Sequence, residues 1–261
     1  MPENAEPRAG DTYIRFNGSD AYVEIPSIDD YSVSTTGALT VSAWMKPDTL
    51  NFPSVESNSD YIHWVGKGDA SGAGGNQEWT FRMYNHHDPL DTPTRPNRIS
   101  FYLFNPRGGL GVGSFVQVPI HKGRWIHLVG VADSTRTYFY KDGQYIRCDT
   151  YRGPQQGPCE IHFQDPDKTV QLVINPQAGA APLRLGTKDL GSFLEGGLTR
   201  VRLWNRALST AEVLDLYSAD NAPQAGLVGE FLLNADTGVT AIDSAQGNNG
   251  TIVNAAWAIE N

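Results

Sequence analysis

Arginine and tyrosine side chains recur on one face of two neighbouring predicted strands, in a pattern that suits the binding of sugars. The segments EWTFRMY and NRISFYLF alternate between two faces, and the more polar face carries Arg82, Tyr84, Arg98 and Tyr102. Tyrosine rings offer flat faces to the C–H groups of a pyranose, and guanidinium groups donate hydrogen bonds to its hydroxyls. We predict a carbohydrate-binding surface at these four residues; the alternative is an ordinary solvated face.

The connection between these two strands is long and contains His86, His87, Asp88 and Arg95. Long loops on a sheet scaffold are a usual place for function, so we add His86 and His87 to the predicted ligand-binding residues. The adjacent histidines also raise the alternative of a zinc site. Neighbours in sequence point apart, however, and no Cys or His partner stands at ligand spacing, which disfavours zinc.

Two oxygen-rich segments could hold a calcium ion, which takes six to eight oxygen ligands. The segment NGSD supplies Asn17 and Asp20, and the segment DSAQGNN supplies Asp243, Asn248 and Asn249. The alternative is that these short polar side chains bond to their own backbone in Asx turns. We predict a structural calcium ion with Asn17, Asp20, Asp243 and Asn248 as ligands.

An enzyme that cleaves polysaccharides is the alternative to a binding protein. Glycoside hydrolysis needs a pair of carboxylates at suitable spacing, and no E-x-D-x-E type of strand motif is present. The segments YFYKDGQYI and EIHF are superficially similar to strands of alginate-lyase-like jelly rolls. If the protein is a lyase, the residues to test are Arg82, Tyr145 and His162; otherwise we predict no catalytic residue.

Strand patterns separated by turns, with few helical patterns, predict an all-β fold whose sheets are antiparallel. The exception is the segment after LTRVRLW. Ser209 and Glu212 form a predicted capping box, and Val213, Leu214 and Tyr217 form an apolar stripe at helical spacing. We therefore expect one short helix near the C-terminus.

The charge and the length of the chain restrict its partners. Its 261 residues carry a net charge of −9, which argues against nucleic acid or an anionic membrane as the main partner. No run of eighteen apolar residues occurs, so we expect no membrane span. The first ten residues, MPENAEPRAG, show no signal peptide and are predicted to be a disordered tail. The oligomeric state cannot be predicted.

The two cysteines, Cys148 and Cys159, flank a loop rich in glycine and proline. An even number of cysteines without a spare predicts a disulfide that closes this loop and a secreted or extracellular protein. The alternative is two free thiols in a cytosolic protein.

Several segments, in their order along the chain, resemble the bacterial laminin-G-like, pentraxin-like branch of the concanavalin A-like lectin/glucanase superfamily. They are RFNGSDAYVEIP, VSAWMKP, RWIHLVGVAD, TYFYKDGQYI, APLRLGT, GGLTRVRLWNRALSTAEVLDLY and GLVGEFLLNADTGVTAIDSAQGNNGTI.

The resemblance implies a single jelly-roll domain over residues 11–261, made of two curved antiparallel sheets. It also implies non-catalytic recognition of a glycan or polysaccharide, makes calcium in such loops common, and favours a half-buried, hydrogen-bonded role for His127. Thr199 and Arg200 stand where the family often has Asp-Glu, which removes an acidic contribution to any metal site there. A protein–protein adhesion or toxin-associated module is the third alternative.

Overall fold

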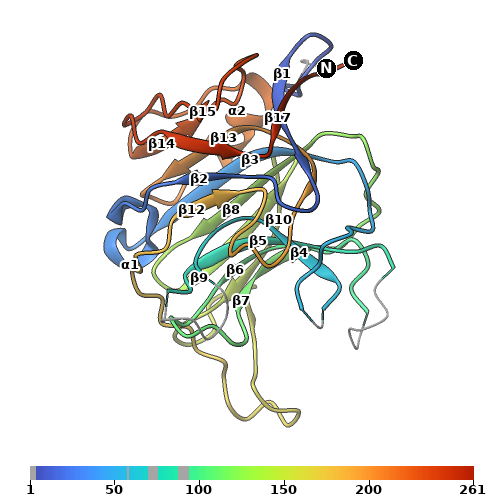
Figure 1. The fold of residues 1–261 in the computed structure, drawn as a ribbon. Coiled ribbons are helices and arrows are strands. Elements are labelled where there is room, and N and C mark those ends of the chain that lie inside the picture. The colour runs from blue at the N-terminus through green and yellow to red at the C-terminus, as the bar shows by residue number, and fades with distance from the viewer. Residues whose placement is uncertain (1–3, 58, 70–75, 88–93) are drawn as a thin grey trace.

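A computed structural model of the chain describes residues 4–57, 59–69, 76–87 and 94–261. Within these residues the chain forms two β-sheets that pack face to face around a shared hydrophobic core (Figure 1). The prediction of an all-β, jelly-roll sandwich is confirmed. A single strand pair is parallel among those described, β10 with β11, and all the other pairs are antiparallel.

The first sheet is ordered in space as β11 (Glu160–Ile161), β10 (Gln144–Thr150), β9 (Arg136–Lys141), β8 (Ile126–Ala132), β3 (Leu39–Pro47), β13 (Glu195–Trp204), β1 (Thr12–Asn17) and β17 (Ala256–Ile259), with β14 (Leu227–Phe231) also pairing with β13. The second sheet is ordered as β15 (Thr240–Ala241), β16 (Gly250–Val253), β2 (Tyr22–Ile25), β12 (Leu183–Leu185), β4 (Tyr61–Lys67), β5 (Trp79–Tyr84), β6 (Ile99–Leu103) and β7 (Val112–Val116). Two single-turn elements, η1 (Asp29–Tyr31) and α1 (Val33–Thr36), connect β2 to β3.

Aromatic rings from both sheets fill the space between them. Phe81 on β5 and Phe101 on β6 are cross-strand partners with ring centroids 5.0 Å apart, and Phe81 also meets Phe139 of β9 at 6.2 Å. Gly130 of β8 lies beneath Phe101, so closely that a Cβ atom there would be 2.4 Å from the ring. The two sheets are therefore in direct contact, and this contact fixes which side chains of β5 and β6 point inward.

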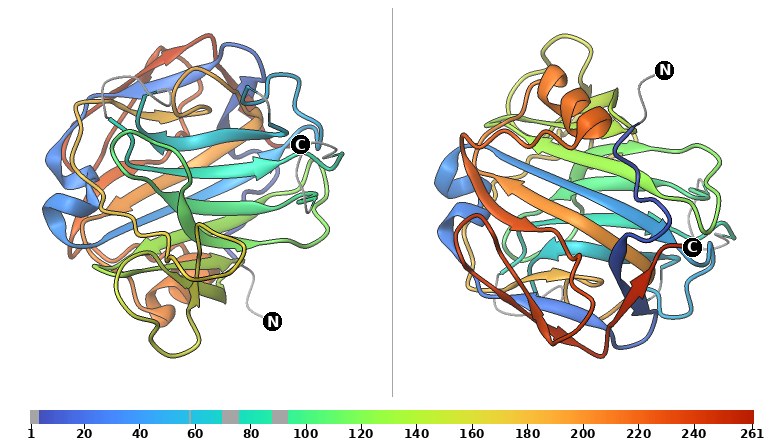
Figure 2. Two further views of the ribbon diagram at one scale, coloured as in Figure 1. Left: turned by 90° about the horizontal axis from the view of Figure 1, so that it is seen from below. Right: turned by 90° about the horizontal axis from the view of Figure 1, so that it is seen from above.

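The predicted helix is α2 (Thr210–Ala219), and it begins as the sequence indicated. The Ser209 side chain accepts the Glu212 N–H, and the Glu212 carboxylate accepts the Ser209 N–H, which completes the capping box. Val213 and Leu216 are the buried residues, whereas Leu214 is 50% exposed. The helix thus packs on the outer face of the first sheet (Figure 2). Of the predicted apolar stripe, Val213 is buried and Tyr217 packs on Trp44, but Leu216 takes the buried place that we predicted for Leu214.

The N-terminal segment lies over the same sheet. Residues 4–10 were expected to be disordered, but this part of the chain is held by hydrogen bonds. The Ala5 N–H donates to the Tyr217 carbonyl at 2.8 Å, the Asn4 side chain donates to the Tyr217 hydroxyl at 2.8 Å, and the Arg200 guanidinium donates to the Ala5 carbonyl. The outer face of the first sheet is therefore covered by both α2 and the N-terminal segment.

His127 of β8 is buried on this covered side. Its Nε2 lies 2.9 Å from the Ser42 hydroxyl, and its ring packs on Trp44. Burial lowers the pKa of His127 to about 3, and the positive charges of Arg202 and Arg200 act in the same direction. The histidine is consequently neutral in the folded protein at all moderately acidic pH values.

This burial predicts a pH-dependent stability. The unfolded chain binds a proton at His127 near the usual pKa of about 6.5, whereas the folded chain does not, so acidification below that value favours unfolding. Between about pH 7 and pH 5 we expect His127 to remove about 2 kcal/mol from the free energy of unfolding. Urea titrations at both pH values should show a smaller loss for His127→Asn than for the wild type. An equal loss in the two proteins would contradict this assignment.

Candidate functional site

The outer face of the second sheet forms a hollow of about 500 Å³ with loops that cross beside it. Its floor comes from β4, β5 and β6, and one wall comes from the excursion that follows β11. The side chains that matter below are Tyr61, Arg82, Tyr84, Tyr102, His162 and Phe163. Arg95 and Arg98 also line the hollow.

The alternation of β5 and β6 explains why this face is polar. Trp79, Phe81 and Met83 point into the core, so Arg82 and Tyr84 point outward. The same rule places Tyr102 outward beside the inward Phe101. The structure therefore brings together the four residues that we predicted on these strands, Arg82, Tyr84, Arg98 and Tyr102.

Three aromatic rings surround the guanidinium group of Arg82. Its guanidinium carbon lies 4.3 Å from the centroid of Tyr61 and 5.1 Å from those of Tyr102 and Phe104. Such cation–π contacts hold the side chain in place without neutralising its charge. Burial raises the pKa of the Tyr102 phenol, which therefore remains a protonated hydrogen-bond donor at neutral pH.

His63 supports Arg82 from below. The Arg82 Nε–H donates to His63 Nε2 at 3.0 Å, so this nitrogen carries a lone pair. Burial lowers the pKa of His63, and the positive charge of Lys188 adds to the effect. The ring is therefore neutral, with its proton on Nδ1, and this proton faces Glu56 Oε2 at 3.6 Å and Asp189 Oδ2 at 3.7 Å.

Glu56, His63 and Asp189 are the residues of the described chain whose ligand atoms converge as for a metal ion, all within 4.8 Å of one another. A metal would need the lone pair of His63 Nδ1, which would move the proton to Nε2, directly against the Arg82 Nε–H. Lys188 Nζ already lies 3.0 Å from Asp189 Oδ2 and supplies a positive charge. The donor set consequently fits an ion-pair network beneath Arg82 better than a metal centre.

The guanidinium groups of Arg98 and Arg147 both stack on the ring of Phe115. Their guanidinium carbons lie 3.9 Å and 4.1 Å from the centroid of Phe115. Arg98 also donates two hydrogen bonds to Gln117 Oε1, at 3.0 Å and 2.8 Å. The aromatic and cationic surface thus continues from the hollow toward β10.

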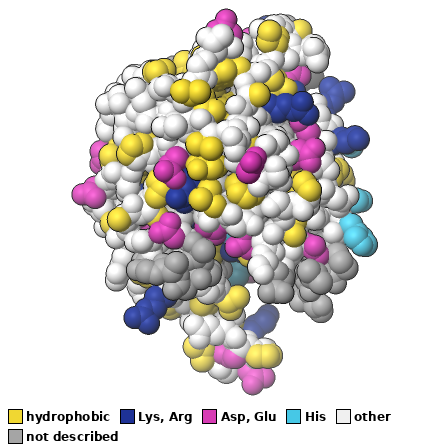
Figure 3. Space-filling view, viewed as in Figure 1, with side chains coloured by type: hydrophobic (Ala, Val, Ile, Leu, Met, Phe, Trp, Pro, Cys, Tyr) yellow, Lys and Arg dark blue, Asp and Glu magenta, His cyan; other side chains and the backbone are white. Residues whose placement is uncertain are grey.

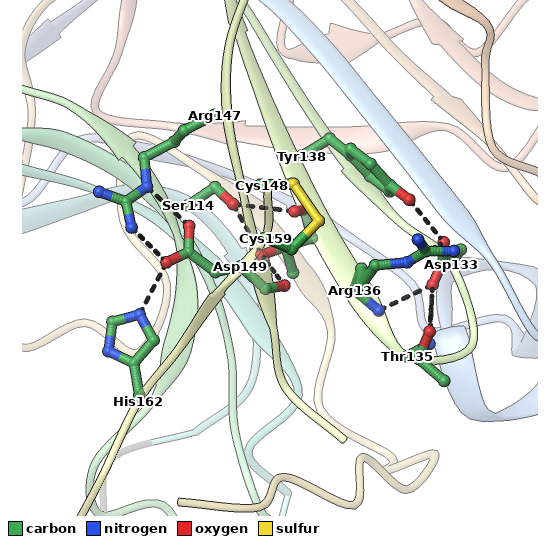
Figure 4. Close-up of a disulfide and its surroundings, with 11 residues drawn as sticks. Ser114, Asp133, Thr135, Arg136, Tyr138, Arg147, Cys148, Asp149, Cys159 and His162 are labelled. Carbon is green, nitrogen blue, oxygen red and sulfur yellow. Dashed lines mark hydrogen bonds and ion pairs between the residues drawn. A yellow bond between two sulfur atoms is a disulfide. The ribbon is translucent and has the colours of Figure 1, made fainter. Parts of the chain in front are cut away.

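Arg147 and His162 meet at the buried carboxylate of Asp149 (Figure 4). Arg147 makes two bonds to it, at 2.8 Å and 2.5 Å, and His162 Nε2 lies 2.8 Å from Asp149 Oδ1. Burial by itself raises the pKa of Asp149, but its bonds to His162 and Arg147 outweigh that effect and hold the pKa below its usual value. The carboxylate therefore orients the His162 ring at the wall of the hollow.

The remaining predicted ligand and catalytic residues lie elsewhere. His86 and His87 are exposed and do not line the hollow; His86 Nδ1 lies 3.0 Å from the Asn97 amide nitrogen. Asp88 falls outside the described residues. Tyr145 is on the far side of the first sheet, against Tyr140 with ring centroids 5.7 Å apart, so the set Arg82, Tyr145 and His162 is not assembled.

The first predicted calcium loop is an Asx turn. Asn17 Oδ1 accepts the backbone N–H groups of Ser19, Asp20 and Ala21 at 3.0, 3.1 and 3.2 Å, and Asn17 Nδ2 donates to Asp20 Oδ1 at 2.7 Å. These oxygens already have donors from the protein. Calcium at Asn17 and Asp20 stays a prediction, and it would require these bonds to be exchanged for metal bonds.

The second predicted calcium loop is bonded in the same way. Asp243 Oδ1 accepts the N–H groups of Glu230 and Ala245 at 2.9 and 3.0 Å, and Asp243 Oδ2 accepts that of Asn248 at 3.0 Å. The Asn249 side-chain oxygen accepts the Asp243 N–H at 2.9 Å. Calcium at Asp243 and Asn248 likewise stays a prediction.

The sequence analysis missed the network beneath Arg82. His63 could have been found, because YIHWVGK places it two residues from Tyr61 on the same face. Glu56 and Asp189 gave no such signal, since they come from two loops that are far apart in the sequence. The pairing of His162 with Asp149 depends on the parallel contact of β10 with β11, which also had no sequence signature.

The fold and the open hollow define a jelly-roll sandwich with a ligand-sized site on one sheet. The family described as the concanavalin A-like lectin/glucanases superfamily matches residues 17–158, and the chain belongs to it. No curated protein matches the chain. Within the described residues, the helices are too short or too polar to cross a lipid bilayer.

Two solved structures illustrate the fold. A candidate carbohydrate-binding protein from Bacteroides ovatus matches with a TM-score of 0.60 at 15% identity, over 98% of this chain and 61% of that one. The chain thus spans less than two thirds of that protein. A heptameric SAP-like pentraxin from Limulus polyphemus matches with a TM-score of 0.53 at 16% identity, over 96% of both chains.

The disulfide between Cys148 and Cys159, which the sequence predicted, joins the residue before Asp149 on β10 to the residue before β11 (Figure 4). Replacing both cysteines by serine should lower the free energy of unfolding by about 3 kcal/mol, because the loop between them becomes unrestrained in the unfolded chain. Chemical denaturation measures this change. Limited proteolysis should also cut residues 150–162 faster in the variant; unchanged stability together with unchanged cleavage would contradict a structural role.

Proposed function

We propose that this protein is a glycan-binding domain that holds its ligand in the hollow on β4, β5 and β6. One observation carries the proposal: aromatic rings, two of them accessible, and guanidinium donors converge in a cavity of about 500 Å³, which is within the range of small-ligand sites. Tyr61, which is partly exposed, and Phe163, which is 38% exposed, offer surfaces for pyranose rings, while Arg82 offers hydrogen bonds. The similarity to a candidate carbohydrate-binding protein supports the same proposal.

The disulfide supports a location outside the reducing cytosol, because such bonds persist mainly in oxidising compartments. An adhesion module would instead present a broad apolar surface. On the described part of the face seen in Figure 3, small groups of hydrophobic side chains are separated by polar and charged ones. The hollow is thus the stronger candidate for recognition.

Phe163→Ala tests the hollow with little risk to the fold, since this ring is 38% exposed. Loss of a stacking surface should weaken the best glycan found on a broad array by about tenfold, or about 1.4 kcal/mol. Tyr145→Ala is the matched control, because this ring is also exposed, at 44%, but lies outside the hollow. Equal effects of the two variants, or no array binding by the wild type, would count against the proposal.

A polysaccharide lyase is the second candidate, because Arg82 and His162 do lie in the same hollow. β-Elimination needs a base for the proton next to the uronate carboxyl and an acid for the leaving oxygen. The proposed binding function predicts that polyuronates incubated with the protein show no rise in ultraviolet absorbance from unsaturated uronates. A rise that His162→Gln abolishes would establish the lyase instead.

A further inference from the structure

Two arginines of the hollow, Arg82 and Arg98, differ from the partly buried arginines in the rest of the described chain, because no described carboxylate forms an ion pair with them. Outside the hollow, every described arginine that is at least partly buried forms an ion pair with a carboxylate. These are Arg136, Arg147, Arg184, Arg200, Arg202 and Arg206. Arg82 and Arg98, which are also partly buried, form no ion pair with any described residue.

Arg82 is held by neutral groups only. Its Nε–H bonds to His63, whose lowered pKa keeps the imidazole uncharged, and the rings of Tyr61, Tyr102 and Phe104 surround its guanidinium. No described residue accepts a hydrogen bond from the two terminal amino groups of Arg82, a residue that lines the hollow. These groups form a planar pair of donors of the kind that matches a carboxylate or a sulfate.

Arg98 is held in the same way. It donates Nε–H and one Nη–H to the uncharged amide of Gln117, and its face rests on Phe115. Arg82 pairs across the strands with Ser100, so Arg98 stands diagonally from it on the same face, at a spacing of about 7–8 Å. A single anionic group between the two, or two such groups on successive sugars, could contact both.

The described lining of the hollow adds no carboxylate to balance these two charges. None of its described lining residues is an aspartate or a glutamate. Asp149, the carboxylate behind His162, is already bonded to Arg147. The described residues of the hollow therefore carry a positive charge in a chain whose net charge is −9.

We infer that the hollow selects acidic glycans, that is, sugars bearing carboxylate or sulfate groups, over neutral glycans. This inference rests on the proposed glycan-binding function and names its ligand class. Charge-assisted bonds to a desolvated guanidinium are stronger than bonds to a hydroxyl, so an acidic group should determine both affinity and orientation. The neutral supports of Arg82 and Arg98 leave their charges available for that group.

Binding of the intact protein to matched polymers tests the inference. The probes are polygalacturonate, which carries carboxylates, and dextran sulfate, which carries sulfates, with methyl-esterified polygalacturonate and dextran as their uncharged counterparts, alongside a broad array of neutral and acidic glycans. We expect binding to acidic members at least tenfold tighter than to neutral ones, and weaker binding at high salt. The preferred polymer distinguishes carboxylate from sulfate recognition.

The outcomes separate the two claims. Binding to neutral glycans as tight as to acidic ones would overturn the inference and leave the proposed function standing. No binding to any glycan would overturn the proposed function itself.

Variants locate the effect in the hollow. Arg82→Gln and Arg98→Gln should each weaken the best acidic ligand at least tenfold and weaken neutral sugars by a clearly smaller factor, while Arg98→Lys should restore part of the loss. Arg124→Gln is the matched control, since Arg124 is exposed just before β8 and does not line the hollow. Melting curves exclude misfolding. Acidic binding that survives both hollow variants would overturn the inference.

Discussion

The contact between Phe101 and Gly130 is the constraint on which the functional face depends. The ring lies so close to the backbone of β8 that no side chain fits beneath it. Phe101 must therefore point inward, and its cross-strand partner Phe81 must do the same. Because side chains alternate along a strand, Arg82 and Tyr102 are then forced to the outer face. The strand register that places the phenylalanines in the hydrophobic core thus also places the polar side chains in the hollow.

Holding a charged side chain on that outer face requires support that does not cancel its charge. Aromatic rings and a neutral histidine supply such support for Arg82. The carboxylates of Glu56 and Asp189 stand one layer deeper, where they face His63 and Lys188 rather than the guanidinium. The negative charge that stabilises the site is in this way kept out of the place where a ligand would bind.

Much of this arrangement could be predicted from local sequence. Alternation placed Arg82, Tyr84 and Tyr102 together because β5 and β6 are consecutive and paired, and the capping box located the start of α2 correctly. Tyr145 was misplaced because lyase similarity says nothing about which face of β10 it occupies, and a register shift between Tyr145 and Arg147 interrupts that strand. Contacts between distant loops had no local signature.

The covering of the first sheet explains why we propose recognition on the second. The helix α2 buries Val213 and Leu216 on the outer face of the first sheet, and the N-terminal segment closes much of what remains. On that covered side, Arg202 is paired with Asp220 and Glu230, as a buried cation requires. Arg82 and Arg98 lie on the other sheet, where water or a ligand can reach them, and for this reason they can remain without a carboxylate partner among the described residues. The topology that puts α2 and the N-terminal segment on the first sheet thus leaves the outer face of the second sheet, with Arg82 and Arg98, accessible.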